Sequence, residues 1–281
     1  MSKSVLILGG TGFLGKPLSR ELTKNKIKGT VRGREANILD LKKLEKEFQK
    51  TKFDYVINAT GQITEPINNC LMQNSVGILN LIKCQSKYRF KLVQISSLLV
   101  YGSRDSLSEK SLLNPLTSYA TCKAYADIII KEFVAPKDFL IIRLSNLYGP
   151  NQTQGLIPYL LNSIKKNKLI AFNDHDGSLT RFFLHVNDAA INIVKFIKND
   201  LNDVYNLIGP DKYNVKEIIS LLNIKSNKPK QVRYSSLKPL GNINKIIESD
   251  KAKKLKYSYK YNLKDFLYQA IAFCNPVSKE N

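Results

Sequence analysis

The fold class is decided by a stretch close to the start of the chain, Ser4-Val5-Leu6-Ile7-Leu8-Gly9-Gly10-Thr11-Gly12-Phe13-Leu14-Gly15. Its apolar first half is typical of a buried parallel strand. Gly9, Gly12 and Gly15 have the G-x-x-G-x-x-G spacing of a strand-to-helix loop, whose glycines permit a tight turn, a close approach to a pyrophosphate and close helix packing. An amphipathic stretch follows, which is the context that makes this motif informative. The stretch predicts a dinucleotide-binding loop, with further contacts from Thr11, Phe13 and Leu14.

Apolar runs and helical patterns alternate along the rest of the chain. We expect strands at 28–31, 53–58, 92–97 and 139–144, and helices at 41–48, 69–86, 119–133, 157–166, 186–197, 215–222 and 263–273. Alternation this regular predicts an α/β protein with a doubly wound parallel Rossmann sheet. We assign residues 1–150 to this NAD(P)-binding domain and 151–281 mainly to a smaller C-terminal α/β lobe, with segments such as 182–205 returning to the Rossmann core.

The composition limits the classes of partner. The formal charge of +21 raises the possibility of a nucleic-acid partner, but most of the 44 basic residues are lysines dispersed along the chain. Because base recognition prefers clustered Arg with interleaved aromatic residues, we expect no specific nucleic-acid partner. No apolar run reaches the ~18 residues needed to cross a membrane, and the N-terminus has no signal-peptide pattern. We expect a cytoplasmic protein without a membrane partner.

The cysteines give no sign of a metal centre. The four of them, Cys70, Cys84, Cys122 and Cys274, are scattered and form no C-x-x-C pair, and no histidine stands near them at ligand spacing. We therefore expect no metal site and predict reduced, buried thiols.

The end of the second expected strand bears on the choice of cofactor. NAD-binding proteins usually place an acidic residue there to bond the ribose 2′-hydroxyl. This chain has Arg32-Gly33-Arg34 instead, and the two guanidinium groups of Arg32 and Arg34 suit a 2′-phosphate, which favours NADP. Glu35, one residue further on, leaves NAD open. Asp40 precedes the helix at 41–48, where it can serve as the N-cap or meet the adenine.

Polar residues follow the strands at the carboxyl edge of the expected sheet, where doubly wound sheets bind ligands. The segment Asn58-Ala59-Thr60 leaves one strand, and Ser97 ends the next. Tyr119 and Lys123 stand four residues apart in the first turns of a helix, which puts both on one face. Because a nearby ammonium stabilises a phenolate, this pair predicts a tyrosine whose pKa falls towards neutrality and which can act as a general acid or base.

Several separated motifs occur in a characteristic order. They are Gly9-x-x-Gly12-x-x-Gly15, Asn58-Ala59, Ser96-Ser97 through Val100-Tyr101-Gly102, Tyr119-x-x-x-Lys123, Arg143 with Asn146-Leu147-Tyr148-Gly149-Pro150, and Arg181-Phe182-Phe183-Leu184-His185-Val186-Asn187-Asp188. Together they resemble the extended short-chain dehydrogenase/reductase family, specifically its NAD(P)-dependent epimerase/dehydratase branch acting on nucleotide sugars.

The resemblance assigns roles to these residues. It implies a catalytic triad of Ser97, Tyr119 and Lys123, with Tyr119 and Lys123 also touching an NADP or NAD cofactor beside Asn58, Ala59 and Thr60. It implies a nucleotide-diphosphate sugar as the substrate, bound between the sheet edge and the smaller lobe by Ser97, Asn146 and Arg181. By analogy with the family, we also expect a homodimer.

One departure from the family pattern narrows the expected reaction. Sugar 4,6-dehydratases of the family carry an Asp-Glu pair directly after the hydroxyl residue, whereas this chain has Leu98-Leu99, neither of which can act as an acid or base. The arginine-bearing strand end and the compact length resemble the NADPH-dependent 4-keto-6-deoxysugar nucleotide reductases, and this is the activity we expect. A nucleotide-sugar 4-epimerase with retained NAD is the alternative, and a non-catalytic NADP-sensing regulator is a lesser one.

Overall fold

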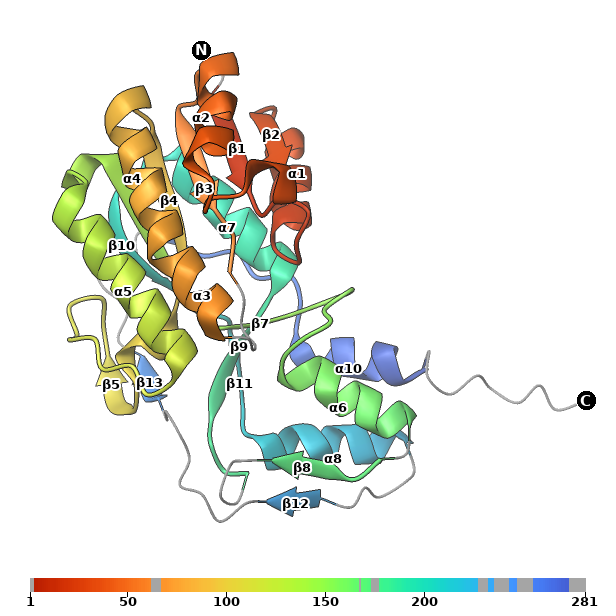
Figure 1. Ribbon diagram of the computed structural model, residues 1–281. Helices are drawn as coiled ribbons and strands as arrows, with labels where there is room; N and C mark the ends of the chain where they lie inside the picture. Colours follow the sequence, from red (N-terminus) through yellow and green to blue (C-terminus); the bar gives the residue numbers. More distant parts are fainter. Residues whose placement is uncertain are drawn as a thin grey trace, which may run out of the picture.

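A computed structural model describes residues 3–61, 67–166, 168–172, 177–226, 232–234, 243–246 and 255–272. The main sheet has six strands, β1 (Ser4–Leu8), β2 (Lys28–Arg32), β3 (Tyr55–Asn58), β4 (Lys91–Ser97), β6 (Phe139–Leu144) and β10 (Asp203–Leu207). They lie in the order β10-β6-β4-β3-β1-β2 and all pair in parallel (Figure 1). This arrangement confirms the predicted α/β class with a parallel Rossmann sheet.

Helices cover both faces of the main sheet. They are α1 (Gly15–Lys24) and α7 (Val186–Lys198) on one face, and α2 (Leu41–Lys50), α4 (Val76–Tyr88) and α5 (Ser118–Phe133) on the other. Because successive strand side chains point to opposite faces, Val5 and Ile7 pack against α1 and α7, whereas Leu6 and Leu8 pack against the other group. The sheet is therefore doubly wound, with a separate apolar core on each face.

The helix expected at 69–86 is two helices, α3 (Ile67–Asn74) and α4, separated by Ser75. Two short polar side chains account for the break. The Asn74 Nδ2 donates to the Cys70 carbonyl (2.8 Å), and the Ser75 Oγ donates to the Leu71 carbonyl (2.7 Å). Asn and Ser side chains compete in this way with backbone donors for helical carbonyls, and the ladder is interrupted where they succeed.

The smaller lobe has its own core, formed by α6 (Leu156–Lys165), α8 (Val215–Ser226) and α10 (Leu263–Ala272). Ile157, Leu160, Ile218, Leu222 and Leu267 meet in that core. The shorter strands are β7 (Asn146–Tyr148), β9 (Arg181–His185) and β11 (Asp211–Tyr213) in one sheet, β8 (Ile170–Phe172) with β12 (Val232–Tyr234), and β5 (Arg104–Leu107) with β13 (Ile243–Ile246). The end of the helix expected at 263–273 and Cys274 lie outside the described residues.

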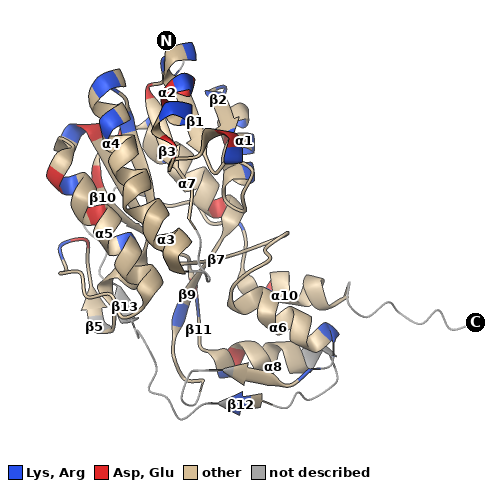
Figure 2. Ribbon diagram, in the orientation of Figure 1, with Lys and Arg blue, Asp and Glu red and all other residues tan. Residues whose placement is uncertain are grey.

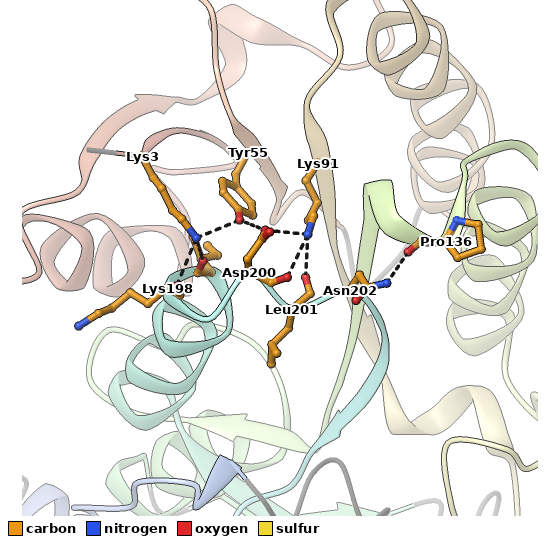
Figure 3. Close-up of polar contacts among 9 residues, drawn as sticks. Lys3, Tyr55, Lys91, Pro136, Lys198, Asp200, Leu201 and Asn202 are labelled. Atoms are coloured by element: carbon orange, nitrogen blue, oxygen red, sulfur yellow. Dashed lines mark hydrogen bonds and ion pairs between the residues drawn. The ribbon is translucent and has the colours of Figure 1, made fainter. Parts of the chain in front are cut away.

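Between two segments of this lobe, the chain returns to the main sheet through α7 and β10, and a polar cluster fixes α7 there (Figure 3). The Lys3 Nζ donates to two terminal carbonyl oxygens of α7 (2.5 and 3.3 Å) and to the Tyr55 hydroxyl (3.1 Å). Lys91 Nζ pairs with Asp200 Oδ1 at 2.7 Å, and the Tyr55 hydroxyl donates to the same carboxylate. These contacts neutralise the carbonyl end of the helix. They tie α7 to the amino ends of β1, β3 and β4, which leaves the carboxyl edge for ligands.

Lys and Arg occur on several elements, among them α2, α4 and α6 (Figure 2). Within the described ranges, no helix combines the length and hydropathy that a membrane crossing requires.

Candidate active site

The glycine loop between β1 and α1 is built so tightly that side chains do not fit. Gly9 has a φ of +75°, which favours glycine, and a Cβ there would lie 2.7 Å from the Ala59 carbonyl oxygen. A Cβ at Gly15 would lie 2.4 Å from both the Gly10 Cα and the Gly9 carbonyl oxygen. The loop therefore folds back on the start of α1 and presents bare backbone above the sheet edge. Backbone of this kind is what a pyrophosphate requires.

A cavity of about 740 Å³ lies over this loop and is the candidate cofactor cleft. Of the predicted cofactor residues, Gly9, Thr11, Gly12, Arg34, Ala59 and Thr60 line it. The other residues predicted for this role are absent from the lining, namely Phe13, Leu14, Gly15, Arg32, Asp40, Asn58, Tyr119 and Lys123. Four further residues that no sequence motif predicted line the cleft, namely Asn37, Asn69, Gln73 and Gln154. These side chains come from loops and from α3, and only the tertiary fold brings them together.

Two charged side chains at and just after the end of β2 are engaged in contacts within the protein. Arg32 Nε donates to the Glu47 carboxylate on α2 at 2.6 Å. The Glu35 carboxylate instead accepts from the Gly33 amide (2.8 Å), and this hydrogen bond holds the pKa of Glu35 below its usual value. Asp40 caps α2 by accepting from the Lys43 amide (3.1 Å). Arg34 therefore lines the cleft, whereas Glu47 holds Arg32, and the Glu35 carboxylate is bonded to the backbone of Gly33, which also lines the cleft.

A second cavity, of about 240 Å³, is the candidate substrate site. Its lining includes Ser97, Leu98, Leu99, Thr117, Asn146 and Arg181. Ser97 ends β4, and its Oγ accepts from the Leu99 amide (3.2 Å) at the start of a short 3-10 turn. The Asn146 Nδ2 donates to the Phe182 carbonyl (3.1 Å), and Arg181 Nη1 donates to the Leu179 carbonyl (3.2 Å). The cavity thus contains the three residues predicted to bind substrate.

The first turns of α5 run from the second cavity to the floor of the first. The Thr117 side chain, which lines the second cavity, caps α5 by accepting from the Ala120 amide (3.2 Å). Tyr119 is half-buried one turn before Lys123, and it lines neither cavity. The Lys123 side chain is 3% exposed, and its Nζ donates to the carbonyl oxygens of Ile95 (3.2 Å) and Thr60 (3.4 Å). Lys123 therefore lies directly beneath the backbone that forms the floor of the cofactor cleft.

The acidity of Tyr119 differs from the sequence-based prediction. Burial raises the pKa of Tyr119 above its ordinary value, and the nearby Cys70 and Asp127 raise it further. Burial also lowers the pKa of Lys123, against the opposing effect of Asp127. The prediction that Lys123 pulls the pKa of Tyr119 down was wrong in direction, because the desolvation of the phenolate dominates. At neutral pH the Tyr119 hydroxyl keeps its proton, and a proton donor is the state that a carbonyl reduction requires.

His185 at the end of β9 belongs to the scaffold of the site. Its Nδ1 accepts from the Asn187 amide (3.2 Å) and so caps α7, and its ring stacks on Tyr261 at 3.9 Å. Burial lowers the pKa of His185 to about 4, so the ring is neutral near pH 7. Cys70, Cys84 and Cys122 are free and buried, and the described residues contain no cluster of His, Cys, Asp and Glu that could hold a metal ion.

A glycine cradle on a Rossmann sheet, with Ser97, Tyr119 and Lys123 near its carboxyl edge, defines the class of short-chain dehydrogenases/reductases. Comparison with known proteins agrees. The chain belongs to the NAD dependent epimerase/dehydratase family, whose model matches residues 5–209.

Several similar proteins are named as enzymes of nucleotide sugars. A dTDP-D-glucose 4,6-dehydratase of Dictyostelium discoideum is 29% identical over 74% of this chain, and the match spans 58% of that protein. A GDP-6-deoxy-D-talose 4-dehydrogenase of Aggregatibacter actinomycetemcomitans is 25% identical over 78% of each chain. The crystal structure of a dTDP-glucose 4,6-dehydratase from Bacillus anthracis in complex with NAD superposes with a TM-score of 0.80 at 21% identity, over 97% of this chain and 96% of that one. This last similarity establishes the fold.

Proposed function

We propose that this protein is a nucleotide-sugar oxidoreductase that reduces the 4-keto group of a 6-deoxysugar nucleotide. The observation that carries the proposal is the chemistry of the smaller cavity. It combines a hydroxyl from Ser97 and a cation from Arg181 with the apolar side chains of Leu98 and Leu99, and its described lining residues include no carboxylate. A cation suits the diphosphate of a nucleotide sugar, and the hydroxyl suits a sugar oxygen.

The cofactor cleft has the shape and chemistry for a dinucleotide. Its volume of about 740 Å³ and the bare backbone at Gly9 and Gly12 fit a pyrophosphate-bridged ligand held by the loop and by Ala59 and Thr60. When bound, such a cofactor supplies the hydride that moves to or from C4 of the sugar.

The chain supplies the proton chemistry. In reduction, the Ser97 hydroxyl donates a hydrogen bond to the sugar O4, and Tyr119 transfers its phenolic proton to that oxygen as the hydride arrives at C4. The raised pKa of Tyr119 keeps this proton in place beforehand. Lys123 holds its ammonium one turn away and stabilises the phenolate that remains. Its bonds to the Ile95 and Thr60 carbonyls fix the position of that charge.

Dehydration is disfavoured by the residues that follow Ser97. Removing water across two sugar carbons needs an acid and a base there, and Leu98 and Leu99 occupy the wall of the cavity instead. The relative from Aggregatibacter supports the same reading, since a 4-dehydrogenase of a 6-deoxysugar nucleotide, run in reverse, reduces a 4-keto-6-deoxysugar.

The contacts at the end of β2 favour NAD over the NADP expected from sequence. Arg32 is held by Glu47, and the Glu35 carboxylate lies against Gly33 and is kept ionised. A carboxylate at this place suits a 2′-hydroxyl and repels a 2′-phosphate. The same observation supports a second candidate, a nucleotide-sugar 4-epimerase that retains NAD.

One panel of assays separates the candidates. A reductase oxidises NADH or NADPH, followed at ~340 nm, when given GDP- or dTDP-4-keto-6-deoxyhexose. An epimerase interconverts UDP-glucose and UDP-galactose without added reductant. If the protein binds NAD or NADP but does neither, the lesser alternative of a non-catalytic regulator is favoured.

We further propose that the protein forms a homodimer in the cytoplasm. The proposal rests on family analogy and on exposed apolar side chains of α3, α4 and α5. These are Leu71 (49% exposed), Met72 (43%), Leu79 (39%), Tyr125 (44%) and Ile128 (55%). Apolar surface of this kind is often covered by a partner. Sedimentation equilibrium gives twice the monomer mass if the proposal is right and the monomer mass if it is wrong.

A further inference from the structure

Two amide side chains lie side by side in the apolar interior of the main sheet. Asn58 on β3 and Gln94 on β4 are in register, and they are 1% and 0% exposed. The Asn58 Nδ2 donates to the Gln94 Oε1 at 2.8 Å. Their neighbours on the same face, Val56 and Leu92, are apolar core residues. Burying two amides among such residues is unfavourable unless their hydrogen bonds are satisfied.

The remaining polar atom of each amide side chain forms hydrogen bonds with a nearby residue, Thr60 for Asn58 and Ile95 for Gln94. The Asn58 Oδ1 accepts from both the amide (3.2 Å) and the Oγ1 (2.6 Å) of Thr60. The Gln94 Nε2 donates to the Ile95 carbonyl at 3.1 Å. Thr60 and Ile95 are the two residues whose carbonyl oxygens accept from the Lys123 ammonium. The buried amide pair therefore holds the two residues whose carbonyl groups accept hydrogen bonds from Lys123.

From this geometry we infer that Gln94 is a positioning residue for Lys123, acting through Asn58 and the Thr60 and Ile95 carbonyls. The inference rests on the proposed function only in giving Lys123 a role in catalysis. Gln94 itself touches neither cavity.

The orientation of the Asn58 amide is the step through which Gln94 acts. Asn58 can present oxygen to Thr60 only while its nitrogen faces an acceptor, and Gln94 Oε1 is that acceptor. An apolar residue at position 94 removes this constraint, so the Asn58 amide can turn over and bring its own N–H towards the Thr60 N–H. The loop that carries the Thr60 carbonyl then loses its anchor.

The close approach of Gly61 to Lys123 restricts where the Lys123 ammonium can lie. A Cβ at Gly61 would lie 3.1 Å from the Lys123 Nζ, so the ammonium fills the space directly under the cleft floor. Displacing the Thr60 carbonyl therefore removes a hydrogen bond from the Lys123 ammonium, and the ammonium has little room to move to a new acceptor.

The test measures Lys123 directly. Gln94→Met keeps the length of the side chain and removes both hydrogen bonds. Leu92→Val is the matched control, because it alters a fully buried residue of the same strand and face without touching the amide pair. Full-length proteins are treated briefly with acetic anhydride over a range of pH, and the acetylation rate of Lys123 is read by peptide mass spectrometry. Circular dichroism confirms folding, and Gln94→Leu replaces Gln94→Met if the latter does not fold.

We expect Lys123 in Gln94→Met to be acetylated about tenfold faster near neutral pH than in the wild type. Lost carbonyl acceptors favour the neutral amine, and a fall of ~1 unit in the pKa of Lys123 raises the neutral fraction tenfold. The midpoint of the pH profile should shift down in Gln94→Met and stay in place in Leu92→Val. Equal rates and midpoints in the wild type and Gln94→Met, or an equal change in the control, would overturn the inference.

A binding measurement in the same experiment separates this inference from the proposed function. Titration with NAD and NADP shows whether the wild type binds a dinucleotide. If it binds neither, the proposed function fails while the acetylation result still decides the role of Gln94. If the wild type binds a dinucleotide and Lys123 is unaffected in Gln94→Met, the positioning role is refuted, whereas the proposed function is still decided by the turnover assays.

Discussion

Replacing Arg143 with methionine should strongly destabilise the protein, because Arg143 is the charged partner of the buried Asp127. Arg143 Nε lies 2.9 Å from Asp127 Oδ2, and the two side chains are 3% and 0% exposed. At ~3 Å and an effective dielectric constant of ~20, their attraction is about 5 kcal/mol. Removing one partner leaves a buried, uncompensated charge, for which losses of about 3–5 kcal/mol are typical. Arg143→Met also removes the bond from Nη1 to the Tyr101 hydroxyl (2.6 Å).

The assay is thermal and urea unfolding followed by circular dichroism. For a chain of this size, the loss corresponds to a fall in Tm of roughly 6–20 °C. The double variant Asp127→Leu with Arg143→Met should recover much of the loss, because it removes the stranded charge. A loss below about 1 kcal/mol, or additive effects in the double variant, would show that the Asp127–Arg143 pair does not stabilise the folded protein in this way.

The loss in Arg143→Met should also depend on pH. Burial raises the pKa of Asp127, and Arg143 is the main influence that lowers it. Without Arg143, folded Asp127 holds a proton to higher pH than unfolded Asp127 does, so the stability of the variant falls as pH rises through that window. The deficit relative to the wild type should therefore be smaller at pH 5 than at pH 8, and the opposite trend would contradict the account.

Three further predictions concern the site and its scaffold. Tyr119→Phe should lower kcat by about 10²–10⁴-fold without changing dinucleotide affinity, and a loss below about tenfold would remove Tyr119 as the proton donor. Glu35→Gln should lower the preference for NAD over NADP in binding by about tenfold, or ~1.4 kcal/mol, whereas Glu45→Gln on α2 should not, and equal ratios in both variants would show that Glu35 has no part in the choice. Because the pKa of His185 is about 4 in the folded protein and 6.5 ordinarily, unfolding takes up a proton between these values, and stability should fall by up to roughly 3 kcal/mol as pH drops from 6.5 to 4. His185→Asn keeps a capping acceptor and should flatten that slope in urea unfolding, so an unchanged slope would assign it to other groups.

Local sequence signals predicted the parts of the site that depend on local geometry. The spacing of Gly9, Gly12 and Gly15 reflects contacts within one loop, and the loop is where the sequence placed it. A spacing of four positions from Tyr119 to Lys123 corresponds to about one helical turn in any fold, and both residues lie in the first turns of α5. The alternation of strands and helices was sufficient for the sheet, because a parallel sheet permits few other arrangements.

Contacts between distant residues could not be predicted in this way. Arg32 was expected to meet a phosphate, but Glu47 on the neighbouring helix takes its guanidinium, and nothing in the sequence pairs them. The direction of the pKa of Tyr119 follows from its burial, which depends on the whole fold. Gln94 falls within the strand expected at 92–97, but its hydrogen-bond partner Asn58 stands 36 residues earlier in the chain, and no sequence pattern pairs the two.

The proposed reduction of a 4-keto-6-deoxysugar nucleotide can be tested by following the hydride from the nicotinamide to the sugar. The wild-type protein is incubated with GDP- or dTDP-4-keto-6-deoxyhexose and with NADH or NADPH deuterated at C4 of the nicotinamide, and the sugar nucleotide is analysed by mass spectrometry and NMR. We predict a 6-deoxyhexose nucleotide with deuterium at C4, formed by the wild type and nearly abolished in Tyr119→Phe. Failure to transfer deuterium to any of these substrates, or formation of a 4-keto-6-deoxy product from dTDP-glucose, would contradict the account.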